Sequence, residues 1–176
     1  MTLKIGLFGG SFNPITKGHI NIAKKILESN IDLDEIWFMP CYENKEKNLV
    51  ECEHRKNMIK IVIKDIKNIN LFDFEIRNKL PNNTLNTINL LYKSEFAKFK
   101  FYFIVGLDVA NSMISWENYN ILIKLIKFIV IPRKNYNIKS KWFLNNKDHI
   151  YLSNIVIDNI SSNEFRKKYI KYNENL

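Results

Sequence analysis

The sequence has 176 residues, of which 46% are hydrophobic, and it carries a formal net charge of +9. This length is typical of one domain, and this composition is typical of a globular protein with a buried core. We therefore expect a single domain over residues 1–176. No stretch is long and apolar enough for a spanning helix, and the N-terminus lacks a signal-peptide pattern, so we expect a cytoplasmic protein.

The excess of positive charge indicates an anionic partner, either a nucleic acid or a phosphate-rich small molecule. The lysines are spread along the chain and form no single stripe, which favours the small molecule. Two cysteines, Cys41 and Cys52, are too few for a disulfide framework and lack the spacing of a zinc site. We therefore expect two reduced thiols and no metal held by the protein itself.

Short apolar runs alternate with segments of helical period, which is typical of a Rossmann-like α/β fold with helices on both faces of a parallel sheet. The predicted strands are residues 3–8, 35–39, 71–76, 101–105, 128–131 and 151–157. The first predicted helix begins near residues 16–18, and the others are residues 53–66, 84–96, 116–126 and 162–172. Ligands of such sheets bind beyond the carboxyl ends of the strands, where the strand order reverses. Residues after the first, fourth and fifth strands, and at the start of the last helix, should therefore converge.

Residues 9–19 join the first strand to the first helix. Gly9 and Gly10 allow a ligand to approach the backbone closely and permit a positive φ. The free N–H groups and the dipole at the helix start favour a phosphate. His19 lies in the first turn and can donate a hydrogen bond to a phosphoryl oxygen, and the hydroxyl of Thr16 can reach the same anion. The alternative is an ordinary strand–turn–helix with His19 on a solvated face.

A second polar group begins the predicted last helix. Ser161 and Glu164 have the spacing of a capping box. Ser162 and Arg166 are four residues apart and therefore share a helix face. A hydroxyl, free N–H groups and a guanidinium at one helix start suit a polyphosphate. A capped helix without a ligand would explain the first pair but not Arg166.

Residues 10–19 resemble the G-x-F-x-P-x-(H/T)-x-G-H signature of the nucleotidyltransferase superfamily, and residues 160–166 resemble its I-S-S-T-x-I-R motif. The resemblance implies that Thr16 and His19 bind the triphosphate and stabilise the transition state, with Arg166 adding positive charge. It also implies an ATP site built from three segments. Its members are Gly9, Gly10, Ser11, Phe12, Thr16, His19, Gly106, Asp108, Ile160, Ser161, Ser162 and Arg166.

Three internal segments resemble nicotinate/nicotinamide mononucleotide adenylyltransferases in particular. In the first, a predicted strand is followed by a turn that contains Gly106 and Asp108, and Trp116 lies further along the chain. Asp108 would accept hydrogen bonds from ribose hydroxyl groups, and Trp116 would offer a flat face to the pyridine ring unless it is simply a packed aromatic residue. The second, residues 75–87, resembles the family's E-x-x-R…P-S-Y-T-x-D-T segment imperfectly. There Thr84 would contact the substrate near the pyridine, or it would cap a helix.

The loop at residues 42–55 is the third such segment, because in the family a basic residue here contacts the mononucleotide phosphate. Lys47 is the preferred candidate, with Lys45 close behind, and a solvated lysine is the alternative. Arg55 resembles the arginine that opens the family's next helix, and residues 128–133 resemble its strand with a trailing Pro-Arg. The predicted mononucleotide site consists of Asn13, Lys47, Thr84, Trp116 and Arg133.

The resemblance implies transfer of AMP from ATP to nicotinate or nicotinamide mononucleotide, with Mg²⁺ as the cofactor that accompanies ATP. The product is deamido-NAD or NAD, and pyrophosphate is released. Because the attacking phosphate is already ionised, catalysis would be positioning and charge neutralisation. The predicted catalytic residues are Thr16, His19, Lys47 and Arg166.

Several alternatives stay open. Threonine at position 16 is usual in pantetheine-phosphate adenylyltransferases, whereas bacterial nicotinate mononucleotide enzymes carry histidine there, but the R-G-x-R type segment of the coenzyme A branch is absent. Another adenylyl- or cytidylyltransferase, a nucleotide-binding protein without catalysis and a basic nucleic-acid binder are the rival functions. The preference for acid or amide is open, and Tyr169 and Tyr172 leave room for a homo-oligomer.

Overall fold

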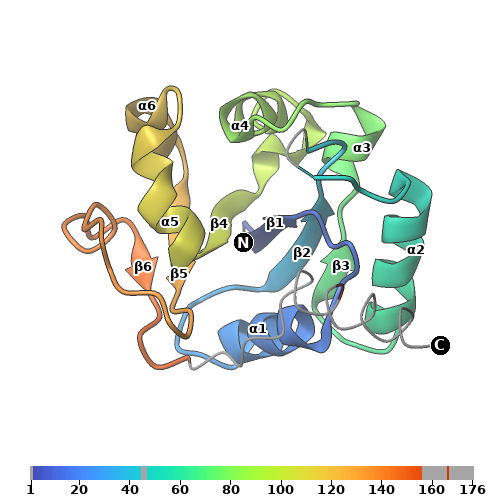
Figure 1. Cartoon of the computed structure of the whole chain (residues 1–176), viewed down its shortest axis with the longest axis horizontal. Coiled ribbons are helices and arrows are strands. Elements are labelled where there is room, and N and C mark those ends of the chain that lie inside the picture. The colour runs from blue at the N-terminus through green and yellow to red at the C-terminus, as the bar shows by residue number, and fades with distance from the viewer. Residues whose placement is uncertain (1, 45–46, 156–165, 167–176) are drawn as a thin grey trace.

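Six parallel strands form one sheet in the order β3-β2-β1-β4-β5-β6. The structure is a computed structural model that describes residues 2–44, 47–155 and 166. The strands are β1 (Lys4–Gly10), β2 (Glu35–Pro40), β3 (Ile69–Leu71), β4 (Lys100–Gly106), β5 (Lys127–Ile131) and β6 (Ile150–Tyr151). The chain first winds outward from β1 to β3 and then returns to the other side of β1 (Figure 1). The predicted Rossmann-like α/β fold is confirmed.

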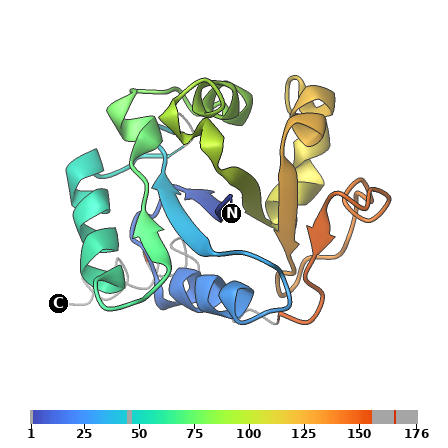
Figure 2. The same ribbon diagram turned by 180° about the vertical axis from the view of Figure 1, so that it is seen from behind.

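Helices cover both faces of the sheet (Figures 1 and 2). They are α1 (Lys17–Leu27), α2 (Cys52–Ile63), α3 (Phe74–Arg77), α4 (Thr84–Leu91), α5 (Leu107–Ser112) and α6 (Tyr119–Leu125), with 3-10 turns at Glu95–Lys98 and Met113–Ser115. Side chains that alternate along each strand enter two separate cores, since successive residues point to opposite faces. In β4, Phe103 joins the core under α4, α5 and α6, whereas Ile104 joins the core under α1 and α2. Within the described residues, no helix has the length and apolar character needed to cross a bilayer.

The predicted strand at residues 71–76 is wrong. β3 ends at Leu71, because its partner β2 also ends nearby at Pro40. The alternating pattern that follows instead belongs to a turn and to α3, whose first hydrogen bond runs from the N–H of Arg77 to the carbonyl of Asp73 (2.8 Å). Phe74 lies on this short helix and is buried in the core. The apolar alternation therefore reflects packing onto the core and not strand geometry.

Other predicted boundaries shift at their ends. The helix predicted to reach residue 96 stops at Leu91, where the Ser94 hydroxyl bonds to the Leu91 carbonyl (2.7 Å) and starts a 3-10 turn. The helix predicted from residue 116 begins at Tyr119. β6 is only two residues long, and residues 152–155 are irregular. Residues 156–157 of that predicted strand, and the last predicted helix apart from Arg166, lie outside the described residues, as do Tyr169 and Tyr172.

Candidate active site

A cavity of about 410 Å³ lies beyond the carboxyl ends of β1, β4 and β5. It gathers residues from the turn after β1, the loop after β2, the start of α4, the ends of β4 and β5, and the C-terminal part of the chain. Twelve predicted site residues line it: Gly9, Gly10, Ser11, Phe12, His19, Lys47, Thr84, Gly106, Asp108, Trp116, Arg133 and Arg166. The expected convergence at the point where the strand order reverses is therefore present.

The two consecutive glycines serve packing, and the expectation of a positive φ there is wrong. Gly9 and Gly10 belong to β1, and neither has a positive φ. A Cβ atom on Gly9 would lie 2.8 Å from the ring of Phe103, and one on Gly10 would lie 3.0 Å from the ring of Phe12. Phe12 itself takes the left-handed conformation, with a φ of 45°. The glycines thus leave room for two aromatic rings in the cavity wall.

His19 presents one ring nitrogen to the protein and leaves the other for a ligand. The backbone N–H of Thr16 donates to Nδ1 of His19 (3.0 Å), and the Thr16 hydroxyl oxygen lies 2.8 Å from the same nitrogen. Burial, with a smaller effect of the positive charge of Arg133, lowers the pKa of His19 to about 4. The imidazole is therefore neutral at pH 7. Because Nδ1 accepts a hydrogen bond, the proton resides on Nε2, which can donate.

Two predicted ligand-binding residues stand behind the cavity wall and not among its lining residues. Thr16 is buried and contacts His19 as described above. Asn13 is also buried, and its side-chain amide donates to the carbonyl of Asn48 (3.3 Å). The carbonyl of Asn13 accepts a hydrogen bond from the Arg166 guanidinium. This contact joins the turn after β1 to the C-terminal part of the chain, so His19 and Arg166 share one site.

Asp108 and Arg133 form an ion pair between the ends of β4 and β5. One carboxylate oxygen of Asp108 takes part in it, while the other, Oδ1, is buried and has no hydrogen-bond partner within the described residues. A Cβ atom on Gly106 would lie 2.5 Å from Oδ1, so the glycine permits this side-chain position. A buried acceptor without a donor is costly unless a ligand supplies one. Oδ1 is thus suited to a hydroxyl donor.

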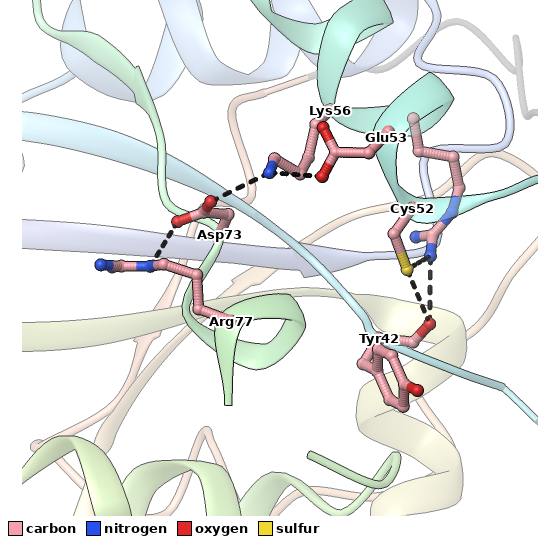
Figure 3. Close-up of polar contacts among 7 residues, drawn as sticks. Tyr42, Cys52, Glu53, Lys56, Asp73 and Arg77 are labelled. Carbon is pink, nitrogen blue, oxygen red and sulfur yellow. Dashed lines mark hydrogen bonds and ion pairs between the residues drawn. The ribbon is translucent and has the colours of Figure 1, made fainter. Parts of the chain in front are cut away.

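Arg55 fixes the loop that carries Lys47. Its buried guanidinium donates to the carbonyl of Val50 through Nε (3.0 Å) and to that of Tyr42 through Nη2 (3.2 Å). Through Nη1 it also donates to the carbonyl of Ser11 in the turn after β1 (3.1 Å). Figure 3 draws the hydrogen bond to the Tyr42 carbonyl as a dashed line. One side chain therefore ties both ends of the loop to the turn after β1, a connection that sequence spacing does not reveal.

Glu75 is a cavity residue for which the sequence suggested no role. It belongs to α3, lines the cavity and is buried. Its carboxylate accepts a hydrogen bond from the hydroxyl of Thr87 (2.9 Å), and this contact and the backbone of Tyr42 both act to lower its pKa. Burial nevertheless raises its pKa to about 7. The sequence signal for this residue was that Glu75 begins the 75–87 segment. Because residues 71–76 were predicted to form a strand, its position in the cavity was not predicted.

The remaining predicted residues divide into two groups. Thr84 lines the cavity and does not cap its helix, because Asn83 is the N-cap and its side chain accepts from the N–H of Asn86 (3.1 Å). Trp116 also lines the cavity while packing against the core. Lys45 and the motif residues Ile160, Ser161 and Ser162 lie outside the described part of the chain.

The chain is similar to a family of known proteins over most of its length. The profile of the family described as Cytidylyltransferase-like matches residues 7–168. A probable nicotinate-nucleotide adenylyltransferase from Clostridium acetobutylicum is 37% identical, covering 97% of this chain and 88% of the relative. A protein of the same description from Fusobacterium nucleatum is 36% identical over 94% of this chain and 87% of the relative. The structure of Plasmodium falciparum nicotinic acid mononucleotide adenylyltransferase complexed with NaAD matches with a TM-score of 0.79 and 30% identity, covering 94% of this chain and 83% of that chain.

Proposed function

The chain belongs to the cytidylyltransferase-like family and, within it, to the nicotinate-nucleotide adenylyltransferases, and from this premise we propose the reaction of its cavity. The protein is an enzyme that transfers AMP from ATP to a pyridine mononucleotide, with nicotinate mononucleotide as the first candidate. Its substrates are nucleotides. The observation that carries the proposal is the meeting of His19, Lys47, Arg133 and Arg166 in one cavity. Four such donors suit the many phosphate oxygens of the two substrates.

The proposed reaction is an in-line displacement. A phosphate oxygen of the mononucleotide attacks the α-phosphorus of ATP, the bond from that phosphorus to the bridging oxygen breaks, and pyrophosphate leaves. Nε2–H of neutral His19 donates to an oxygen whose negative charge increases in the transition state. Arg166 and Lys47 neutralise the phosphates, with Lys47 facing the mononucleotide. Positioning and charge stabilisation then account for the rate enhancement.

We propose that Asp108 binds a ribose hydroxyl through Oδ1, the buried acceptor that has no hydrogen-bond partner in the part of the chain that the structure describes. Trp116 and Thr84 would surround the pyridine ring from the other end of the cavity. Mg²⁺ would enter with ATP, bound to its phosphate oxygens, and would neutralise part of their charge. Thr16 and Asn13 would act by positioning His19 and Arg166.

We also propose a cytoplasmic reaction, since Cys41 and Cys52 are both free thiols, as in a reducing compartment. A pyrophosphate-release assay with ATP and Mg²⁺ tests the function. Nicotinate mononucleotide should support turnover, whereas phosphopantetheine should not. Turnover with phosphopantetheine alone would place the enzyme in the coenzyme A branch. ATP binding without pyrophosphate release from any acceptor would indicate a nucleotide-binding protein instead.

A further inference from the structure

Glu75 lies in the part of the cavity where the pyridine ring is expected. It lines the cavity together with Asn82, Thr84 and Trp116, which come from the start of α4 and from the segment after α5. The Thr87 hydroxyl of α4 contacts Glu75, and Thr84 precedes Thr87 by about one helical turn, so Glu75 lies on the Thr84 side of the cavity. This contact places Glu75 at the expected pyridine end of the site. The role assigned below rests on the proposed function.

The carboxyl group is held in place by α4. The Thr87 hydroxyl of α4 donates to it (2.9 Å), and the backbone of Tyr42 acts to lower its pKa. Thr87 itself is fully buried, and its hydroxyl oxygen also lies 3.2 Å from the carbonyl oxygen of Asn83. A buried carboxyl fixed in this way cannot turn away from a ligand that approaches it, so its protonation state matters to that ligand.

The charged neighbours of Glu75 are already paired or lie on other segments. On its own element, Asp73 forms ion pairs with Arg77 (2.7 Å) and with Lys56 of α2 (3.2 Å), as Figure 3 shows. Glu75 also lies near the thiol of Cys41, the residue that follows β2. Burial raises the pKa of this thiol, so the thiol stays protonated near neutral pH. Lys47 lines the same cavity from the loop after β2. Near neutral pH, Glu75 itself is thus the group that exchanges a proton.

Two pyridine mononucleotides differ only in the substituent on the ring. The carboxylate of nicotinate accepts hydrogen bonds and carries a negative charge, whereas the amide of nicotinamide also donates. We propose that Glu75 selects between them: its protonated carboxyl donates to the nicotinate carboxylate, and its ionised form repels that carboxylate and accepts from the nicotinamide amide. The raised pKa of about 7 places this change in the physiological range. Acid-over-amide preference should therefore fall as the pH rises.

The test is the ratio of the two dissociation constants, nicotinamide mononucleotide over nicotinate mononucleotide, measured by calorimetry on the full chain between pH 6 and 8.5. The ratio cancels the titration of the substrate phosphate, which both ligands share. In the wild type it should fall at least tenfold over this range. In Glu75→Gln, whose side chain stays neutral, the ratio should vary less than twofold. A flat ratio in the wild type, or an unchanged slope in Glu75→Gln, overturns the inference.

A second pair of variants keeps the carboxyl and moves its titration. Thr87→Val removes a donor that favours the ionised form, so the midpoint of the ratio should move to higher pH. Thr87→Ser retains the hydroxyl and should retain the wild-type midpoint. A merely structural role would leave both midpoints alike, which counts against the inference. If both ligands bind but neither supports pyrophosphate release, the proposed function fails while the binding ratio still decides the role of Glu75.

Discussion

His19 and Glu75 are buried ionisable groups assigned to opposite ends of the cavity, and burial shifts their pKa values in opposite directions. At the phosphate end, the pKa of His19 falls to about 4, so the imidazole is neutral at pH 7. At the pyridine end, the pKa of Glu75 rises to about 7, so the carboxyl is divided between two forms. Desolvation disfavours the charged form in both cases. With the roles proposed above, the phosphate end would keep a constant donor while the pyridine end would respond to pH.

The largest expected effect is the loss of the constant donor. His19→Ala should lower kcat by about 10²- to 10⁴-fold, because the Nε2 hydrogen bond to the transition state is removed. Thermal unfolding should show that the variant is folded. The control is His54→Ala on the exposed side of α2, which should keep wild-type turnover. A His19→Ala enzyme of near-normal kcat would remove the residue from the mechanism.

The next largest effect concerns the free energy of unfolding at mildly acidic pH, to which His19 and Glu75 should contribute with opposite signs. In the unfolded chain, His19 has a pKa near 6.5 and Glu75 near 4.5. Between pH 6.5 and 4.5 the unfolded state holds more protons at His19, so its contribution to stability falls with falling pH. The folded state holds more protons at Glu75, so that contribution rises with falling pH.

Relative to the wild type, His19→Ala should therefore gain about 2 kcal/mol in unfolding free energy on going from pH 6.5 to 4.5, and Glu75→Gln should lose about 2 kcal/mol. Urea unfolding at several pH values measures both. His149, whose pKa burial also lowers, adds the same slope to all three proteins and cancels in the comparison. Slopes of the same sign in the two variants would contradict the opposite effects of burial.

The cation in the loop after β2 should affect binding more than chemistry. Lys47→Ala should raise the KM for the mononucleotide about tenfold, since one charge-assisted contact to its phosphate is lost. The matched control is Lys60→Ala, an exposed lysine on α2. Steady-state kinetics with ATP saturating provides both constants. An unchanged KM would leave Lys45 as the candidate.

The smallest expected effects come from two threonines, one at each end. Thr16→Val removes a hydroxyl 2.8 Å from Nδ1 of His19 and should lower kcat about two- to fivefold, with little change in KM. Thr84→Val should instead raise the mononucleotide KM by a similar factor. Each variant is the control for the other. If both altered the same constant, the division between a phosphate end and a pyridine end would be wrong.

The sheet could be predicted because β1, β2, β4 and β5 are buried on both faces and read as continuous apolar runs. The turn after β1 could be predicted because its residues are neighbours in sequence. α3 could not be predicted, because four residues are too few to show a helical period. The alternation of Phe72 and Phe74 is also typical of a strand. The positions of Arg55 and Glu75 depend on tertiary contacts between separate segments. No local pattern encodes which carbonyls surround a buried guanidinium or how deeply a carboxyl is desolvated.

Arg55 has a consequence for how this enzyme can diversify. Its guanidinium holds the carbonyls of Tyr42 and Val50, the two ends of one loop. Because both ends of the loop are fixed by Arg55, we expect substitutions between these anchors to leave β2 and α2 in place. Changes of substrate preference should therefore accumulate between positions 43 and 49. A library randomised there would retain folding far more often than one that includes position 55.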